Sequence, residues 1–397
     1  MVKMKILFLT TKFPYPPDSG GKIDTYNNLI LLAKNFDVIF VYLEEKNKYE
    51  EDFKEKTSIK NIYYFPLDTR NKLWKIALNT FSQYPYTISK YWSFETCEKI
   101  KYLIKRENIS IVFLDHLHTA FYGNLIRKDF SSTKILLREH NVESEFWQRV
   151  YLEEKNLLKK LFLRIQARKV LNYEKNIVKI FDKCLMISKR DEKILKSICK
   201  EAKTTLVPAA IDLDKYREYR AINIVPFSMI FIGDYSWIPN VKGVLWFLEK
   251  VWPKVKNNFP DAKIFIIGRK PPNTIKRYAS RNVIVAGEVD DVKQAIARAD
   301  IFIAPLFSGA GIRIKILEAM AIGKPVVSTS LGASGINVEH MKNIIIADTE
   351  KQFLDGIKYL LAKREARDKL AKNGIRVIES DHSFEKIEQA LRQAVEE

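Results

Sequence analysis

The residues best suited to chemistry lie in one segment near the C-terminus, PLFSGAGIRIKILEAMAIGKPVVST at positions 305–329. Gly309 and Gly311 precede a helical pattern, and Arg313 and Lys315 fall in the first turn of that helix. The N-terminus of a helix offers free backbone N–H groups and the positive end of the helix dipole to an anion. Two cations at that end are unfavourable for the helix itself, which prefers carboxylates there. The pattern therefore predicts a phosphate-binding site at this helix start.

The elements that must position this segment alternate between strands and helices along the whole chain. In the first half, five apolar runs predict strands, at 5–10, 37–43, 61–67, 109–115 and 134–140. In the second half, six more follow, at 228–235, 262–268, 282–288, 300–305, 325–329 and 343–348. Continuous apolar strands separated by helices are typical of parallel sheets that are buried on both faces. The sequence thus predicts an α/β protein with two doubly wound, Rossmann-like domains.

The length of 397 residues suits two domains better than a single core. We expect residues 1–205 to form an N-terminal domain and residues 206–222 to form a hinge. Residues 223–382 would form the C-terminal domain, and 383–397 a C-terminal helix that could return to the N-terminal domain.

Composition and cysteine usage favour a globular intracellular protein. Cys97, Cys184 and Cys199 are scattered, so they predict neither a disulfide framework nor a zinc site, and we interpret them as buried thiols in a reducing cytoplasm. No apolar window reaches the length of a membrane-spanning helix. The short apolar run at the N-terminus lacks a small-residue cleavage site, so it is expected to be a buried strand rather than a signal peptide.

Ligands of doubly wound sheets bind beyond the carboxyl ends of the strands. In the first half, Asp18, Gly20 and Gly21 lie in the loop after the first strand, where consecutive glycines allow the backbone to approach a ligand closely. His118 and His140 follow the fourth and fifth strands. We expect these loops to face those of the second domain across a cleft.

Four segments resemble retaining glycosyltransferases of family 4 (group 1), which have the GT-B fold. The longest, G-x-R-x-K-x-L-E-A-M-A-x-G-x-P-V-V-S-T at 311–329, is similar to the C-terminal signature of that family. FPYPPDSGGK at 13–22 is similar to its N-terminal glycine loop, and the segments at 231–255 and 287–305 agree with a W-x-P-N motif and with the approach to the donor site. The resemblance covers essentially the whole chain and is closest to enzymes of bacterial exopolysaccharide and surface-glycan synthesis.

This resemblance implies a nucleotide-diphosphate sugar as donor, bound mainly by the C-terminal domain, and a glycan or lipid-linked acceptor, bound mainly by the N-terminal one. It implies no metal ion and no other cofactor. Arg313 and Lys315 would neutralise the diphosphate as it leaves, and Glu318 would accept hydrogen bonds from the ribose. The further donor-binding residues would be Gly309, Ala310, Gly311, Ile312, Gly287, Val289, Asn240, Lys242, Gly20 and Gly21.

The acceptor site would contain His118, His140 and Asp18. His140 matches a family position that contacts the acceptor, so it is also a catalytic candidate. A same-face attack in which the donor phosphate takes the acceptor proton would need no base from the chain.

The sequence departs from the family pattern at two places. The family often carries a donor-sugar-binding Glu eight residues before the ribose-binding one, and Ala310 stands there. It also often has a basic pair in the loop after the first strand of the second domain, where this chain offers only Lys242 as an equivalent. The diphosphate charge would therefore rest more heavily on Arg313 and Lys315, and the sugar itself is not predicted.

A basic helical pattern at 152–170 combines an apolar stripe with six cations, from Lys155 to Lys169, and no acid between them. Such a helix could contact anionic lipid headgroups, or its lysines could simply face solvent. We expect a cytoplasmic enzyme, with peripheral attachment to the inner face of the cell membrane as a further hypothesis.

Two alternatives stay open at this stage. One is a sugar-nucleotide epimerase of the same architecture, which would need carboxylates around the donor sugar and gains no help from Ala310. The other is a basic nucleic-acid-binding protein, favoured only by the net charge of +19. Because no recognised nucleic-acid module occurs and the basic residues are dispersed, we expect no nucleic-acid partner.

Overall fold

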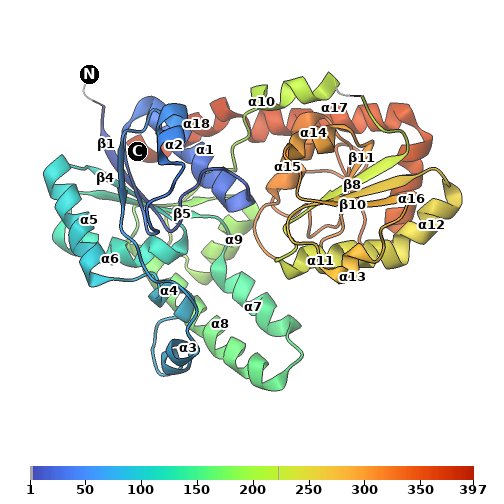
Figure 1. Cartoon of the computed structure of the whole chain (residues 1–397). Coiled ribbons are helices and arrows are strands. Elements are labelled where there is room, and N and C mark those ends of the chain that lie inside the picture. Colours follow the sequence, from blue (N-terminus) through green and yellow to red (C-terminus); the bar gives the residue numbers. More distant parts are fainter. Residues whose placement is uncertain (1–2, 222) are drawn as a thin grey trace. The chain divides into compact units, whose positions relative to one another are not determined.

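The computed structural model describes residues 3–221 and 223–397, so residues 1 and 2 of the expected N-terminal domain and Ile222 of the expected hinge lie outside it (Figure 1). The chain forms two compact units. Unit 1 contains Met1–Ala210 and Ile387–Glu397, and unit 2 contains Ile211–Lys386. The segment 206–222, which we expected to be a hinge, is thus divided between the units after Ala210, and the last eleven residues group with unit 1.

Unit 1 is built on a seven-stranded parallel sheet with the strand order β3-β2-β1-β4-β5-β6-β7. The strands are β1 (Lys5–Thr10), β2 (Asp37–Tyr42), β3 (Asn61–Tyr64), β4 (Ile111–Asp115), β5 (Lys134–Glu139), β6 (Lys183–Met186) and β7 (Thr204–Leu206). The sequence predicted the first five. It missed β6, whose residues Cys184, Leu185 and Met186 have no strong strand preference, and β7, which has three half-buried residues.

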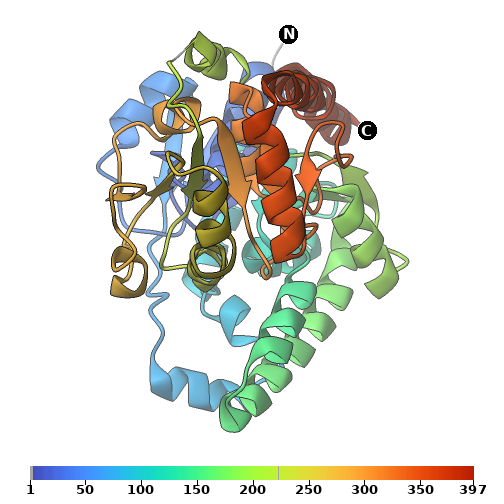
Figure 2. The same ribbon diagram turned by 90° about the vertical axis from the view of Figure 1, so that its right-hand side faces the viewer.

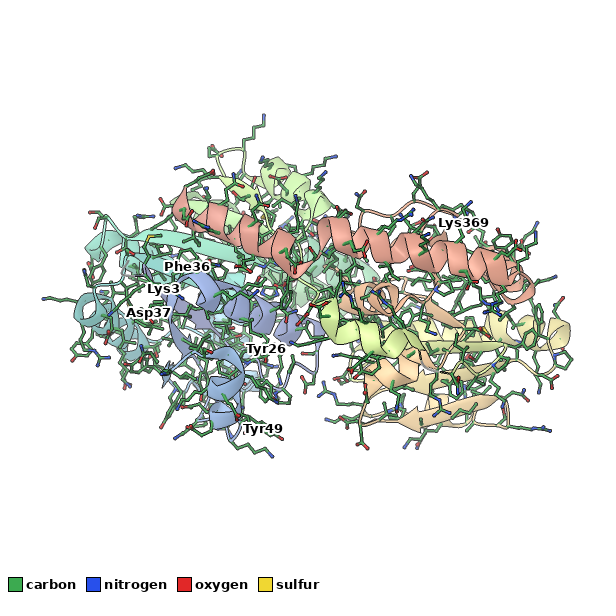
Figure 3. All side chains as sticks on the ribbon, turned by 90° about the horizontal axis from the view of Figure 1, so that it is seen from above. Lys3, Tyr26, Phe36, Asp37, Tyr49 and Lys369 are labelled. Carbon is green, nitrogen blue, oxygen red and sulfur yellow. The ribbon has the colours of Figure 1, made fainter. Side chains whose placement is uncertain are left out.

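The helices of unit 1 cover both faces of this sheet. They are α1 (Gly20–Asn35), α2 (Glu50–Thr57), α3 (Leu73–Asn79), α4 (Tyr86–Ser89), α5 (Phe94–Glu107), α6 (Ala120–Asp129), α7 (Glu143–Glu153), α8 (Leu157–Ile177), α9 (Lys189–Ile198) and the greater part of α18 (Phe384–Glu396). Figure 3 marks Phe36 at the end of α1 and Asp37 at the start of β2. Completely buried aliphatic side chains of the strands, such as Leu7, Val112 and Leu137, form the core beneath the helices.

Two local predictions for unit 1 were wrong. The expected continuous helix at 152–170 is interrupted between α7 and α8, because the side chain of Asn156 caps α8 by accepting a 3.0 Å hydrogen bond from the Lys159 N–H. Gly20 and Gly21, expected in a loop, instead form the first turn of α1. Their backbone N–H groups therefore lie at a helix N-terminus rather than in a flexible loop.

Unit 2 contains a six-stranded parallel sheet with the order β10-β9-β8-β11-β12-β13, as six apolar runs predicted (Figure 2). The strands are β8 (Ser228–Ile232), β9 (Lys263–Ile267), β10 (Val283–Gly287), β11 (Ile301–Ala304), β12 (Val326–Ser328) and β13 (Ile345–Ile346). The helices are α10 (Asp214–Arg217), α11 (Ile238–Trp246), α12 (Trp252–Asn258), α13 (Asn273–Lys276), α14 (Val292–Ala297), α15 (Ile314–Ile322), α16 (Glu350–Ala362) and α17 (Arg364–Asp381), the last carrying Lys369 in Figure 3.

In each sheet the strand order reverses beside the first strand of the unit. The reversal lies between β1 and β4 in unit 1, and between β8 and β11 in unit 2. The crevice outside the carboxyl ends of the strands at such a point is where open α/β sheets bind their ligands. The residues that follow these four strands are therefore the first place to look for chemistry.

Two glycines allow the backbone to pack tightly at the reversal point of unit 2. A Cβ on Gly243 of α11 would lie 2.1 Å from the carbonyl oxygen of Pro305, just after β11. A Cβ on Gly268 would lie 1.7 Å from the carbonyl oxygen of Gly233, and Gly268 has a φ of +137°. Any side chain at either position would push apart the loops that follow β8, β9 and β11.

The three cysteines are free and buried, as predicted. Within residues 3–221 and 223–397, no helix is both long and apolar enough to cross a membrane.

Candidate active site

The glycine loop and helix α15 of unit 2 have the form that the sequence predicted. Gly309 and Gly311 adopt positive φ values of +101° and +76°, which only glycine tolerates readily. The loop then enters α15, with Arg313 at the N-cap and Lys315 in the first turn, and the first turn of the helix carries no acidic residue. Both cations thus lie at the positive end of the helix dipole.

The ammonium group of Lys315 is held at the reversal point of the second sheet. Its Nζ donates hydrogen bonds to the carbonyl oxygen of Ile232, at the end of β8, and to Oδ1 of Asn240, over 2.8 and 2.9 Å. It also lies 4.6 Å from the ring centroid of Phe231. Burial, together with the nearby charge of Arg313, lowers the pKa of Lys315 to about 7. No carboxylate offsets this charge among the groups that act on it, so an incoming anion would stabilise the protonated form.

The guanidinium of Arg313 curls back over the loop that precedes it. It donates to the carbonyl oxygens of Ala310 and Gly311, the latter over 2.8 Å, and more weakly to Ser308. A Cβ on Gly309 would lie 2.8 Å from Nη2 of Arg313. The side chain thus holds the loop in shape, and these three hydrogen bonds go to neutral carbonyl groups that a phosphate could replace with a stronger, charge-assisted pair.

Glu318 lies one turn further along α15 and is oriented by a residue that the sequence did not predict. The hydroxyl of Tyr216, on α10, donates a 2.9 Å hydrogen bond to Oε1 of Glu318. Burial raises the pKa of Glu318, while this hydrogen bond and the charge of Lys293 oppose the rise. The ammonium of Lys293 also sits 4.7 Å from the ring of Tyr216. Tyr216 lies in the segment expected to be a hinge, and no motif singled it out.

The remaining donor-site candidates of unit 2 differ in their hydrogen bonds and in their burial. Asn240 is fixed from both sides, because its Nδ2 donates to the carbonyl of Asp234 while its Oδ1 accepts from Lys315. Gly287 ends β10 with a φ of +72°, and Val289 follows it, half-buried. Lys242 is exposed on α11. Ala310 and Ile312 lie half-buried in the loop itself.

A second polar cluster surrounds Asp115, the last residue of β4, at the point where the strand order of unit 1 reverses. Its Oδ2 accepts hydrogen bonds from the hydroxyls of Thr10, at the end of β1, and Thr25, on α1, over 2.9 and 2.8 Å. Its Oδ1 lies 2.7 Å from Nε2 of His140, just after β5. Burial favours the neutral acid, but His140, His116 and the hydrogen bonds hold the pKa of Asp115 well below its ordinary value.

His116 and His140 stack against each other, with ring centroids 3.6 Å apart and an angle of 18° between the planes. His116 adopts a positive φ of +73° and places Nε2 3.5 Å from Asp115. Burial and the adjacent His140 lower the pKa of His116 to about 3, against the opposing effect of Asp115. His116 is therefore a neutral ring at physiological pH. The sequence had marked its loop but not this residue.

A buried ion pair lies beside His140 and helps to orient its ring. Arg138, which is completely buried on β5, makes a two-pronged contact to Asp24 of α1, with distances of 3.0 and 2.9 Å. The same Asp24 carboxylate lies 3.5 Å from Nδ1 of His140. Asp24 and Asp115 therefore flank the two ring nitrogens of His140. This arrangement fixes the ring plane and can stabilise a positive charge on the ring.

Between Arg138 and His140, Glu139 points into the opposite side of the sheet. It is 1% exposed, and its Oε1 has no hydrogen-bond partner within the described part of the chain. Burial and the nearby carboxylate of Glu174 raise the pKa of Glu139 well above its ordinary value. Such an environment favours the neutral, protonated form of Glu139. This carboxyl group is therefore unsuited to act as a nucleophile.

The other predicted residues of unit 1 lie apart from the Asp115 cluster or at its edge. The ring of His118 makes an edge contact with Tyr91, at a centroid distance of 5.3 Å, and burial lowers the pKa of His118. Asp18 is exposed and pairs with Lys22 over 3.2 Å. Gly20 and Gly21 are exposed in the first turn of α1, next to this pair.

Among the described residues, one group has the composition of a metal site. Ligand atoms of Asp115, His116 and His140 lie within 4.8 Å of one another. Both carboxylate oxygens of Asp115 already accept hydrogen bonds, from His140 and from two threonine hydroxyls. The Asp115 carboxylate is thus already held by hydrogen bonds from within unit 1.

The fold defines the class of the protein. Solved structures with the same two-unit α/β fold include sucrose-phosphate synthase from Thermosynechococcus elongatus, with a TM-score of 0.74 at 15% identity, over 99% of this chain and 98% of that one. Anabaena HepE in complex with UDP and glucose has a TM-score of 0.68 at 14% identity, over 99% of each chain. The expected GT-B fold is confirmed.

Sequence comparisons add a family match within the second unit. Residues 226–363, which include the α15 site, match the family model of group 1 glycosyl transferases. A 44.6 kDa protein of the cps region of Klebsiella pneumoniae is 28% identical over 96% of this chain and 97% of its own length. Phosphatidyl-myo-inositol mannosyltransferase of Mycobacterium tuberculosis is 30% identical over 32% of this chain and 35% of its own. Residues 226–363 thus form a group 1 glycosyl transferase domain, and the comparisons favour a glycosyltransferase over the epimerase and nucleic-acid-binding alternatives.

Proposed function

We propose that this glycosyltransferase moves a sugar from a nucleotide-diphosphate donor to a glycan or lipid-linked acceptor, with retention of configuration and without a metal ion. One observation carries the proposal. A glycine loop enters α15 with Arg313 and Lys315 at the positive helix end, and Glu318, oriented by Tyr216, lies one turn on. A nucleoside diphosphate carries an anionic diphosphate and a ribose with free hydroxyl groups. The two cations and Glu318, one helical turn apart, match these two parts.

In this proposal Arg313 and Lys315 stabilise the diphosphate as the bond to the sugar breaks, a role that a metal ion fills in other enzymes. Glu318 accepts hydrogen bonds from the ribose. The backbone of residues 309–312 binds the phosphates or the sugar, and Gly287 and Val289 bind the base. Asn240 holds Lys315 in place, and Lys242 contributes charge from the exposed side of α11.

The acceptor is proposed to bind at the Asp115 cluster of unit 1, where His140 contacts the reacting hydroxyl. His118 and Asp18 would contact more distant parts of the acceptor, and Gly20 and Gly21 would offer N–H groups to donor or acceptor. The product belongs to a surface polysaccharide or a glycolipid, in line with the cps-region and phosphatidyl-myo-inositol relatives. We further propose that the enzyme works in the cytoplasm, at an anionic membrane surface contacted by the basic residues of 155–169.

A thermal-shift screen with UDP-, GDP- and ADP-sugars in the presence of EDTA tests the donor assignment. One of these nucleotides should raise the melting temperature of the wild type, and Arg313→Ala and Glu318→Ala should weaken that response. Arg364→Ala is the matched control, because this arginine of unit 2 has a side chain that is 84% exposed and lies 3.8 Å from Asp368. If no nucleotide stabilises the wild type, or if all three variants respond alike, the donor site lies elsewhere.

A further inference from the structure

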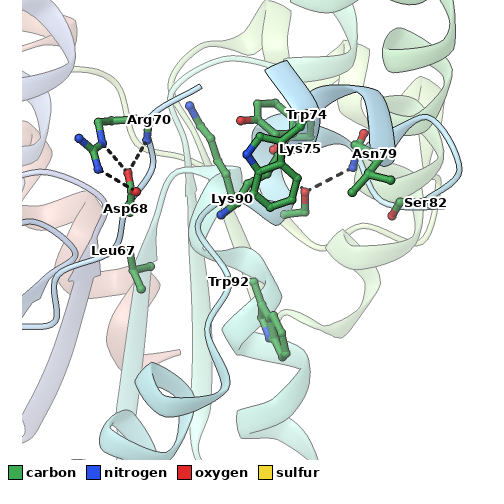
Figure 4. A pocket seen from close by; sticks show the side chains of 12 residues that line it. Leu67, Asp68, Arg70, Trp74, Lys75, Asn79, Ser82, Lys90 and Trp92 are labelled. Atoms are coloured by element: carbon green, nitrogen blue, oxygen red, sulfur yellow. Dashed lines mark hydrogen bonds and ion pairs between the residues drawn. The ribbon is translucent and has the colours of Figure 1, made fainter. Parts of the chain in front are cut away.

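A pocket of about 490 Å³ lies in unit 1, outside the Asp115 cluster (Figure 4). It is formed by α3, α4 and the segments that flank them, between Leu67 and Trp92. Apolar side chains, including Leu67, Trp74, Leu78 and Trp92, form one part of its wall. The described lining residues also include three cations, Arg70, Lys75 and Lys90, but a single carboxylate, Asp68.

The charge of this pocket is unbalanced. Asp68 is already engaged by Arg70, over 2.8 and 3.0 Å, and by Lys72, over 2.9 Å. Lys75 is exposed and lies over the ring of Trp74. Burial and the charge of Lys12 lower the pKa of Lys90, whose Nζ donates a long 3.4 Å hydrogen bond to Oδ1 of Asn71. An anionic group would relieve this positive charge, and apolar wall area remains for hydrocarbon.

The pocket is directly connected to the predicted acceptor residues through three consecutive positions. Lys90 and Trp92 line the pocket, while Tyr91 between them packs its ring against His118. The rings of His118 and His116 are 6.2 Å apart, and His116 stacks on His140. The charge of Lys90 also contributes to the lowered pKa of His118. A molecule held in the pocket would therefore lie next to the residues proposed to bind an acceptor.

Large apolar side chains surround this region and face solvent. On and after α3, Leu73, Trp74, Leu78 and Phe81 are 86%, 60%, 62% and 91% exposed. At the start of α8, Leu157, Leu158 and Leu161 are 81%, 83% and 58% exposed. Lys169 of α8 donates to the carbonyl oxygens of Asn79 and Thr80, which attaches α3 to α8, and Figures 1 and 2 both show the two helices side by side at one end of unit 1.

Exposed apolar patches of this kind mark interaction surfaces, and the cations interspersed here select the partner. Lys155, Lys159 and Lys160 lie among the exposed leucines of α7 and α8, and Lys72 and Lys75 lie beside those of α3. Leucine, tryptophan and phenylalanine ringed by lysine suit the interface of an anionic bilayer, where rings and chains enter the hydrocarbon boundary and ammonium groups meet phosphates.

We propose that the pocket between Leu67 and Trp92 binds the phosphate-bearing headgroup of a lipid-linked acceptor, which the α3–α8 surface takes from an anionic membrane. This inference rests on the proposed function and narrows its acceptor to an anionic amphiphile. The lipid chain follows the exposed apolar side chains, and the headgroup reaches Lys90 and, past Tyr91, the histidines.

The test uses vesicles of phosphatidylcholine with and without phosphatidylglycerol whose acyl chains are brominated, because bromine quenches tryptophans that enter the hydrocarbon. The wild type should bind the anionic vesicles and be quenched, and Trp74→Phe should remove most of the quenching. Lys75→Gln and Lys90→Gln should each weaken binding about fivefold. Matched controls in unit 2 are Lys256→Gln, on an exposed lysine, and Ile224→Ala, on a side chain that is 49% exposed.

The outcomes separate this inference from the proposed function. Equal binding by the Lys75, Lys90 and control variants would overturn it, as would quenching that Trp74→Phe leaves unchanged. Competition by inorganic phosphate or glycerol phosphate as strong as by soluble short-chain phosphatidylglycerol would also overturn it, because the pocket would then bind phosphate and not a lipid. The thermal response to a nucleotide sugar should persist in every variant. A wild type that binds vesicles but no nucleotide sugar would refute the transferase assignment instead.

Discussion

Raising the pH should weaken donor binding through one residue, Lys315. In the free protein its pKa is lowered to about 7 by burial and by Arg313, so its ammonium loses the proton near neutrality. A bound diphosphate would favour the charged form and raise this pKa. Binding must then be accompanied by uptake of a fraction of a proton that grows as the pH rises above 7, and the affinity must fall as the pH rises.

The size of the effect follows from the titration. A group with a pKa of about 7 is about half protonated at pH 7 and about one-tenth protonated at pH 8. The dissociation constant should therefore rise about fivefold to sixfold between these pH values, about 1 kcal/mol, and approach tenfold per unit at higher pH. At pH 8 about 0.9 proton should be taken up for each donor molecule bound.

Isothermal titration calorimetry in buffers of different ionisation enthalpy measures both quantities between pH 6.5 and 8.5. The ligand should be an intact nucleotide sugar, because the terminal phosphate of a free nucleotide has a pKa of about 6 and would add its own protons. Lys315→Arg provides the control. The arginine stays charged, so this variant should lose the pH dependence even if the longer side chain fits poorly beside Ile232 and Asn240.

The lowered pKa of Lys315 also makes the stability of the folded chain depend on pH. Because the pKa of Lys315 is lower in the folded chain than in the unfolded one, the unfolded chain binds more protons between pH 7 and about 10. The contribution of Lys315 to stability therefore improves as the pH rises through this window. A donor affinity that is constant from pH 6.5 to 8.5, with no proton uptake, would refute the assignment of Lys315 to the diphosphate.

Three further predictions concern the scaffold. Arg138→Met should lower the free energy of unfolding in urea by about 3–5 kcal/mol, because it removes the buried guanidinium that pairs with Asp24, and adding Asp24→Asn should restore part of the loss. A single variant as stable as the wild type would contradict this. The folded-state pKa of His116, about 3, lies below its unfolded value, so protonation at lower pH favours the unfolded chain. Between pH 6.5 and 5 the free energy of unfolding of the wild type should fall by about 1 kcal/mol more than that of His116→Gln, a value reduced because the side chain is 26% exposed. Parallel pH profiles of the two proteins would argue against it. Gly243→Ala should lower the free energy of unfolding by about 3 kcal/mol, because the added methyl group would clash with the carbonyl oxygen of Pro305. Gly21→Ala has open space around the added Cβ within the described structure, so its melting temperature should stay nearly unchanged. If the backbone of Gly21 contacts substrate, this second variant should transfer sugar more slowly.

The strand pattern was predicted well where runs were long. All six strands of unit 2 and β1 to β5 of unit 1 follow from apolar runs, and most of these strands are buried within their sheets. β6 pairs with β5 and β7 pairs with β6, so these two strands are determined by their neighbours in the sheet. The break between α7 and α8 depends on one capping asparagine, Asn156, within an otherwise helical pattern.

The donor half of the site was also largely predicted, because its parts are close in the sequence. Gly309, Gly311, Arg313 and Lys315 belong to one loop and one helix turn, so their types and spacing carry the information. Tyr216 could not be predicted, because it reaches Glu318 from a segment that is distant in the sequence and has no motif.

The sequence by itself determined a glycine loop with two cations at a helix start, because loop geometry and helix polarity are local properties of the chain. Only the tertiary structure decided how these groups are charged and what surrounds them. The lowered pKa of Lys315 comes from its burial beside the end of β8. The Asp115 cluster exists because β1, β4 and β5 are neighbours in the sheet, which brings Thr10, Asp115 and His140 together from distant positions in the chain. Burial and neighbours depend on strand order, which no single segment of the sequence contains.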